Sequence, residues 1–465
     1  MHAIDYSLIA IYLAALLWLG LKNRSKVTTV ADLILDGRRL TLPAFVASLV
    51  STWYGGILGV GEYSYQYGIS NWLVFGAPYY LAAIIFALVL SKKARQSKLV
   101  TIPERLAQVY DNKTALVGAI IVFMMTVPAA YILMLGVLGK EFFGWPLWIG
   151  VICGTIFSIV YVYFGAFRSV VRTDILQFVL MFAGFVTMTL VLVSEYGGFG
   201  YLKQNLPVGH FTWHGGNSGF YIATWYFIAL ATLIEPAFYQ RCYAVKSTNV
   251  STKGIFVSIF CWIIFDFLTT VCGLYAKAIL PDLTDPVASY PALAKAILPA
   301  GLLGVFAVAL LSTIMSTVDS YSFIAASTFG NDIIPRFKRV TESQIIKLTQ
   351  FGLILAAAMA IVWALFFQSA VDIWHAFGSI ATPALLVPVL TSFVGKRRLN
   401  SKWAFVSIIS SGGISLVWYF SNGWTTDGTY WFGLEPIFSG LFVSLVIFFV
   451  FARPNIVSDL QQSNR

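Results

Sequence analysis

Long apolar runs alternate with short polar segments along the whole chain. Thirteen runs reach the length of about 20 residues that a helix needs to cross the hydrocarbon core of a bilayer. They lie at residues 4–21, 42–67, 70–91, 114–139, 147–165, 174–194, 219–239, 253–279, 299–329, 346–367, 371–393, 403–421 and 434–452. The pattern predicts an all-α polytopic membrane protein with about thirteen transmembrane helices, in which residues 1–465 form a single transmembrane domain.

Two of these predicted helices, the second and the seventh, contain residues that interrupt a helix. The second holds Gly55, Gly56, Gly59 and Gly61, and the seventh holds Glu235-Pro236. Glycine weakens a helix, and proline removes a backbone donor. Interrupted backbone at membrane depth is tolerated where it lines a cavity or is buried in protein. Two broken helices five apart indicate an inverted-repeat transporter with a midplane binding site, although Gly and Pro are also ordinary in membrane helices.

Composition and charge agree with a membrane location. Hydrophobic residues make up 58% of the chain and charged residues 11%, against about 25% charged in soluble proteins. If successive loops alternate sides, one side holds only Lys140, Lys203, Lys277 and Lys295 of the 30 Lys and Arg residues. This positive-inside bias predicts an external N-terminus and a cytoplasmic C-terminus. The net charge of +10 therefore orients the protein and does not indicate a nucleic-acid partner.

The residues that carry enzyme chemistry do not form a recognisable pattern. The four cysteines and four histidines have no spacing typical of a zinc site or a disulfide framework. No nucleotide-binding or nucleophile motif occurs, and the loops leave no room for a soluble domain. We therefore expect no enzyme activity, no organic cofactor and no obligatory protein partner.

One predicted helix, at 299–329, carries a stripe of hydroxyl groups. Thr313, Ser316, Thr317 and Ser320 recur at i, i+3, i+4 and i+7 and so share one helical face, with Asp319 among them. An ionisable residue inside a membrane usually faces protein, water or an ion, and clustered oxygen ligands suit a small hard cation. The alternative is a Ser/Thr-rich contact between two helices.

Several motifs in order resemble the sodium:solute symporter family. The relevant segments are 32–38, 101–106 with Thr-x-Pro-Glu, 161–177 ending in Thr-Asp-x-x-Gln, 197–199, 236–241 followed by 244–246, and 315–320. Each motif alone is weak, but their order and spacing are specific. The resemblance is weaker through the C-terminal third.

The resemblance implies a leucine-transporter-type fold with a five-plus-five inverted repeat and broken helices 2 and 7. Its parts would be an N-terminal extra helix at 1–30, a first repeat at 40–195, a second repeat at 219–393 and two C-terminal helices at 400–452. It also implies Na⁺ as the co-transported ion. By the family's pattern, the sodium ligands would be carbonyls near Ser51 and Tyr54, the carbonyl of Thr313 and the hydroxyls of Ser316 and Thr317, with Asp174 close by.

Asp319 departs from the family members that carry serine at this position. We hypothesise that Asp319, Ser320 and Asp174 form a second cation site, or that Asp319 carries a proton. The alternative is that Asp319 bonds locally to hydroxyls of its own helix.

The solute is expected to bind between the two breaks. Candidate residues are Trp53, Tyr54, Gly56, Glu235, Trp262 and Asp266. Acids and aromatic rings together suit an amine or a quaternary ammonium through ion pairing and cation–π contact. The alternative is that these residues serve packing and internal polar contacts.

The sequence thus favours a secondary active transporter that couples sodium to a small polar organic solute by alternating access. We expect it in a lipid bilayer, as a multi-pass protein of a bacterial inner membrane. A proton-coupled carrier of the same fold and a membrane sensor module are the alternatives.

Overall fold

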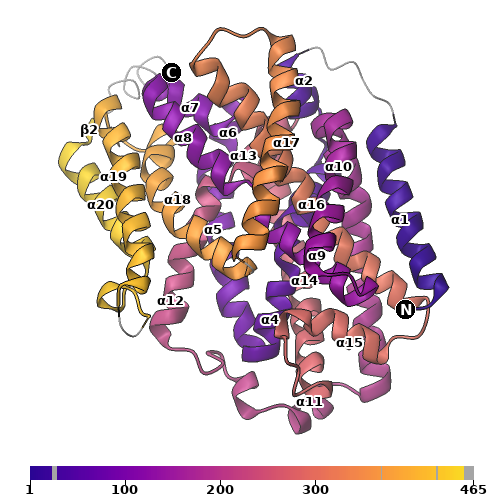
Figure 1. Cartoon of the computed structure of the whole chain (residues 1–465). Coiled ribbons are helices and arrows are strands. Elements are labelled where there is room, and N and C mark those ends of the chain that lie inside the picture. Colours follow the sequence, from indigo (N-terminus) through magenta and orange to yellow (C-terminus); the bar gives the residue numbers. More distant parts are fainter. Residues whose placement is uncertain (23–28, 368, 426–427, 455–465) are drawn as a thin grey trace.

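The computed structural model describes residues 1–22, 29–367, 369–425 and 428–454. Most of the helices run side by side in one bundle (Figure 1). Helix α1 (Ala3–Leu21) lies at one edge, and α19 (Ser401–Phe420) and α20 (Pro436–Phe451) lie at the opposite edge. The N-terminus and the last described residues, in strand β2 (Arg453–Pro454), lie at opposite ends of the bundle.

Helices account for nearly all regular structure. Those of the first half are α2 (Val30–Leu35), α3 (Leu42–Trp53), α4 (Ile57–Tyr67), α5 (Ala77–Ile85), α6 (Ser91–Gln96), α7 (Ile102–Val109), α8 (Asn112–Met125), α9 (Ala129–Phe143) and α10 (Leu147–Tyr196). The others are α11 (Phe199–Asn205), α12 (Gly219–Ile228), α13 (Pro236–Ala244), α14 (Thr248–Ile279), α15 (Ser289–Ile297), α16 (Leu302–Ser327), α17 (Glu342–Phe367) and α18 (Ala370–Phe393). Strands β1 (Arg397–Arg398) and β2 (Arg453–Pro454) pair antiparallel.

Eleven helical segments in the described part of the chain are long and apolar enough to cross a membrane. One of them, α10, is 50 residues long and breaks at Ala166, whose backbone has φ 53° and ψ −160°. Counting its two arms separately and adding α20 would give the thirteen spans expected from the sequence. The exact count stays a prediction.

Both predicted interruptions are present. The second predicted span divides into α3 and α4, joined by the short turn η2 (Tyr54–Gly56). The seventh divides into α12 and α13, joined by η7 (Ala229–Ile234) and by Glu235, whose backbone is extended. Glycine in the first break lets the backbone leave the helical conformation, because it has no Cβ atom. Proline in the second break lacks the N–H group that would donate a helical hydrogen bond.

Helix α1 is fastened to α16 by a buried carboxylate. Asp5 Oδ1 accepts hydrogen bonds from the backbone N–H groups of Gly301 at 2.7 Å and Gly304 at 2.9 Å, at the start of α16. Those N–H groups have no partner within their own helix. Asp5 therefore caps a helix that lies almost 300 residues further along the chain.

We expect Asp5→Ala to lower the free energy of unfolding by about 1–3 kcal/mol, because it leaves buried donors without a partner. Unfolding in detergent would measure the loss. Ser7→Ala is the control, since the exposed Ser7 hydroxyl donates to the Ala3 carbonyl of its own helix. Equal stability of the two variants would contradict the capping role.

Candidate ion and substrate sites

The hydroxyl stripe of α16 is buried and meets the break in the α3–α4 span. Thr313, Ser316 and Thr317 have no exposed surface. Thr317 Oγ1 donates to the carbonyl of Thr52 at 2.7 Å, in the last turn of α3. Ser316 Oγ donates to the carbonyl of Thr313 at 3.4 Å. The predicted hydroxyls and two carbonyls therefore gather where α3 unwinds.

Close approach of the two helices depends on a glycine. A Cβ atom at Gly55 would lie 2.2 Å from Thr317 Oγ1. Ser51 and Tyr54, the other predicted ligands in the α3–α4 span, lie close to Gly55 in the chain. Ser51 turns its hydroxyl into its own helix, toward the Ala47 carbonyl at 2.9 Å. The carbonyls of Ser51 and Tyr54 stay predicted ligands, whereas the Thr52 carbonyl, which the sequence did not indicate, faces Thr317.

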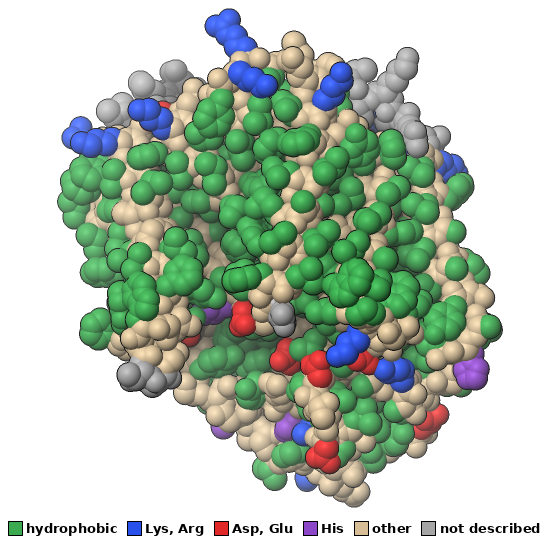
Figure 2. Space-filling model, viewed as in Figure 1, with side chains coloured by type: hydrophobic (Ala, Val, Ile, Leu, Met, Phe, Trp, Pro, Cys, Tyr) green, Lys and Arg blue, Asp and Glu red, His purple; other side chains and the backbone are tan. Residues whose placement is uncertain are grey.

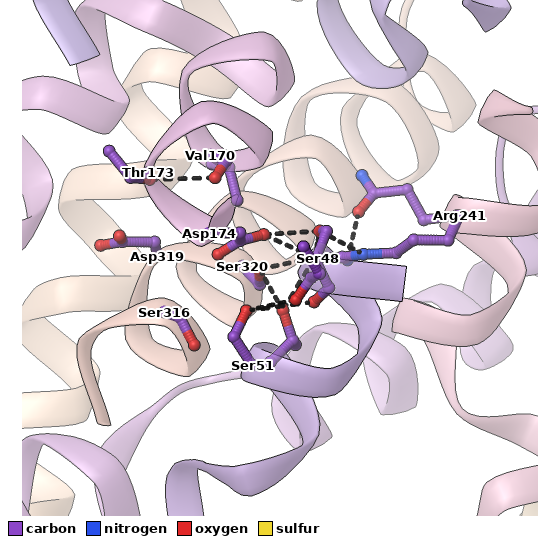
Figure 3. Close-up of polar contacts among 12 residues, drawn as sticks. Ser48, Ser51, Val170, Thr173, Asp174, Arg241, Ser316, Asp319 and Ser320 are labelled. Carbon is purple, nitrogen blue, oxygen red and sulfur yellow. Dashed lines mark hydrogen bonds and ion pairs between the residues drawn. The ribbon is translucent and has the colours of Figure 1, made fainter. Parts of the chain in front are cut away.

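A buried arginine organises the polar groups beside this junction (Figure 3). Arg241 of α13 is fully buried. Its Nη2 donates to Ser320 Oγ at 2.6 Å and to Thr52 Oγ1 at 2.9 Å, and lies 3.6 Å from Asp174 Oδ2. Its Nε donates to Ser48 Oγ at 3.2 Å, and Ser48 Oγ in turn donates to Asp174 Oδ2 at 2.5 Å. One guanidinium thus joins α3, α10, α13 and α16.

Asp319 has different partners from Asp174. Tyr161 donates its phenolic proton to Asp319 Oδ2 at 2.5 Å. In Figure 3 the Asp319 carboxylate points away from the Asp174–Arg241 pair. Three buried acceptors here have no hydrogen-bond partner among the described residues, namely Asp319 Oδ1, Asp174 Oδ1 and Gln177 Oε1. Buried acceptors without donors are uncommon. A bound cation, or a proton on one of the two carboxylates, would give such an acceptor a partner.

All six predicted substrate residues line one cavity of about 220 Å³. Trp53, Tyr54 and Gly56 come from the first break, Glu235 from the second, and Trp262 and Asp266 from α14. A Cβ at Gly56 would lie 2.5 Å from the ring of Trp374, so glycine keeps this wall open. The two breaks therefore face the same space.

Hydroxyl groups and rings line this cavity densely. The hydroxyls of Tyr54 and Tyr80 both donate to the carboxylate of Asp266. The ring of Trp53 lies 5.7 Å from that of Trp262 and 5.5 Å from that of Tyr79, measured between centroids. Such rings form a firm wall and offer electron-rich faces to a cation.

Some of the residues in these sites were not indicated by the sequence. They are Ser48, Thr52, Tyr80, Tyr161, Arg241 and Trp374. Signals existed for Tyr161 and Arg241, because both lie in motifs that resemble the family, at 161–177 and 236–241, and an arginine near the end of an apolar span demands a partner. The other four are ordinary in membrane helices and became visible only through their contacts.

The fold and the paired breaks define a class, the secondary transporters of leucine-transporter type. A Na⁺-coupled sialic acid symporter, solved in a substrate-bound outward-open state, has the same fold with a TM-score of 0.80, at 17% identity over 98% of this chain and 99% of that one. A nucleobase-cation-symport-1 family transporter in a closed conformation matches with a TM-score of 0.60, at 11% identity over 90% of this chain and 93% of that one.

The chain belongs to the sodium:solute symporter family, whose model matches residues 33–411. The osmoregulated proline transporter OpuE of Bacillus subtilis is 24% identical over 470 residues, covering 94% of this chain and 92% of that protein. The sodium/pantothenate symporter of Escherichia coli is 24% identical over 457 residues, covering 93% and 92%. These proteins are transporters and not enzymes, as the sequence predicted. The matches do not favour the sensor module or the proton-coupled carrier.

Proposed function

We propose that the protein binds Na⁺ between the break in the α3–α4 span and the hydroxyl stripe of α16, and carries a small polar organic solute with it. The contact that supports this most directly is the 2.7 Å hydrogen bond from Thr317 Oγ1 to the Thr52 carbonyl. It shows that a hydroxyl of the stripe and a carbonyl of the break reach the same point. Oxygen ligands of this kind suit a hard cation.

The sodium ligands in this proposal are the hydroxyls of Ser316 and Thr317, the carbonyl of Thr313 and carbonyls of the break. Thr52 supplies one of these carbonyls, with Ser51 and Tyr54 as its neighbours. Asp174 contributes negative charge nearby, although Arg241 offsets much of it. Sodium would hold α3 and α16 together at this contact. Because Tyr54 lies next to the contact and lines the solute cavity, this would couple ion binding to that cavity.

The orientation and the division into repeats belong to the same proposal. Lys and Arg side chains gather at the end of the molecule that holds strand β2, the last described part of the chain (Figure 2). By the positive-inside rule this end is cytoplasmic and the N-terminus is external. A bacterial inner membrane is the location we propose, because relatives such as the Escherichia coli sodium/pantothenate symporter are bacterial. In this proposal residues 40–195 and 219–393 form the two repeats, between an extra helix within 1–30 and two helices within 400–452. Residues 23–28, 368 and 426–427 of these ranges lie outside the described residues.

Uptake into proteoliposomes tests the transport function. Purified protein should accumulate a labelled solute when NaCl is outside and KCl is inside, and should stop when KCl replaces the external NaCl. Sodium should also raise the melting temperature of the protein in detergent. The absence of both effects would contradict the proposal.

We also propose that Asp319 belongs to a second cation site or carries a proton. The three unpartnered acceptors Asp319 Oδ1, Asp174 Oδ1 and Gln177 Oε1 support it. Asp319→Asn should then lower the number of cations moved per solute by one, as measured by reversal potentials in proteoliposomes. Asp372→Asn, which changes an exposed carboxylate, should leave that number unchanged. An unaltered stoichiometry and pH profile in Asp319→Asn would contradict the role.

A further inference from the structure

The charged side chains that line the solute cavity are acidic. Two carboxylates line it, those of Glu235 and Asp266, and its described lining contains no Lys or Arg. His375 also lines the cavity, but its Nε2 lies 2.8 Å from Glu435 Oε2. The buried guanidinium of Arg241 is not part of the lining and is engaged by Asp174, Ser48 and Ser320. A bound solute therefore meets acceptors and negative charge.

The two carboxylates differ in their partners and in their exposure. Asp266 accepts hydrogen bonds from two phenols, those of Tyr54 and Tyr80, and is 3% exposed. Glu235 caps helix α13, where its Oε1 accepts a long bond of 3.3 Å from the N–H of Ala237, and its side chain also interacts with that of Tyr321. Glu235 is 7% exposed, and a carboxylate has about four acceptor positions. A donor that enters the cavity therefore reaches Glu235 more readily than Asp266.

Aromatic faces complete the surroundings of both acids. Tyr131 lies between two other rings of the lining, with centroids 5.4 Å from Tyr321 and 5.8 Å from Trp374. Trp53 and Trp262 line the cavity beside Asp266. A cation within about 6 Å of such a face is attracted by about 0.5–2 kcal/mol, with the larger value in a desolvated site.

We propose that the solute is a small organic cation, an amine or a quaternary ammonium without a carboxylate, whose charged group sits against Glu235 and the surrounding rings. Asp266 is a positioning residue that holds Tyr54 and Tyr80 in the wall. A carboxylate on the solute would face two like charges with no basic side chain to bind it. The volume of about 220 Å³ suits a small molecule. This inference rests on the proposed function, since it takes the cavity to be the transport site.

Binding to the purified full-length protein in detergent tests the solute class. Tryptophan fluorescence reports on the cavity because four of its lining residues are tryptophans, namely Trp53, Trp225, Trp262 and Trp374. The probes are ethanolamine and choline as organic cations, glycine betaine and proline as zwitterions, pantothenate as an anion and glucose as a neutral solute. Each is titrated in NaCl and in KCl. Saturable signals are expected for ethanolamine or choline, and should be stronger in NaCl.

Variants connect the signal to the proposed contacts. Glu235→Gln keeps the shape and removes the charge, and it should raise the Kd for the organic cation at least about tenfold. Trp53→Leu should raise it roughly 3- to 30-fold. Glu141→Gln is the control, because this carboxylate pairs with Lys295 away from the cavity, and its Kd should match that of the unaltered protein. Sodium-dependent thermal stabilisation shows that each variant is folded.

Two results overturn the inference while the proposed function stands. One is sodium-dependent binding of proline, pantothenate or glucose with no response to either organic cation. The other is an unchanged Kd for the organic cation in a folded Glu235→Gln protein. If sodium neither stabilises the protein nor strengthens binding of any probe, the proposed function fails and the inference fails with it.

Discussion

Arg241→Met is expected to abolish sodium-driven uptake and to lower the free energy of unfolding by about 3–5 kcal/mol. The reason is the burial of Asp174, whose Oδ2 lies 3.6 Å from Arg241 Nη2 with no exposed surface on either side chain. Without the guanidinium, a carboxylate would remain unpaired in a low-dielectric interior. Ser48, Thr52 and Ser320 would also lose their shared donor. Thermal unfolding in detergent and uptake into proteoliposomes measure the two effects.

A double variant separates the charge from the packing. In Arg241→Met/Asp174→Asn both charges are absent, so more than half of the lost stability should return. The free energy of unfolding of Arg241→Lys should lie between those of the native protein and Arg241→Met. A lysine keeps the charge, but it lacks the planar guanidinium that reaches three other helices. Native stability in Arg241→Met, or no recovery in the double variant, would contradict the role of the ion pair.

Thr317→Val is expected to raise the sodium concentration for half-maximal uptake at least about tenfold. Valine has nearly the same shape as threonine but lacks the hydroxyl. The substitution removes one proposed sodium ligand together with the hydrogen bond to the Thr52 carbonyl. Sodium titrations of uptake, at a fixed solute concentration, measure the shift.

A second threonine of the same stripe provides the control. Thr313 donates its hydroxyl to the Ala309 carbonyl of its own helix at 2.7 Å, and only its backbone carbonyl is a proposed ligand. Thr313→Val should therefore shift the sodium titration by less than about twofold. A large shift in Thr313→Val with none in Thr317→Val would show that the hydroxyl of Thr313, and not that of Thr317, is the sodium ligand.

Local features of the sequence predicted both breaks and the hydroxyl stripe. Gly55, Gly56 and Pro236 act on the backbone directly, so the α3–α4 and α12–α13 interruptions could be placed without knowing the fold. The spacing of Thr313, Ser316 and Thr317 in the sequence puts their side chains on one face of any α-helix. The six candidate substrate residues also lie together, because both breaks and α14 border one cavity.

Features that depend on the meeting of distant helices could not be predicted in the same way. The carbonyl that faces Thr317 belongs to Thr52, next to the predicted Ser51. Thr52 lies in the last turn of α3, where several carbonyls have no partner within the helix, and the sequence does not show which of them meets α16. Arg241 was placed in a motif, yet its contacts with Asp174 and Ser320 join segments far apart in the chain. The pairing of Asp319 with Tyr161 is likewise a contact between two helices. None of these contacts leaves a periodic signal.

Equilibrium binding of ²²Na⁺ to the purified protein tests the sodium site most directly. The account predicts saturable binding to the native protein that is strengthened by the transported solute and weakened at least about tenfold in Ser316→Ala/Thr317→Val. Thr313→Val should bind as the native protein does. Saturable binding that the double variant leaves unchanged would contradict a sodium site between α16 and the break in the α3–α4 span.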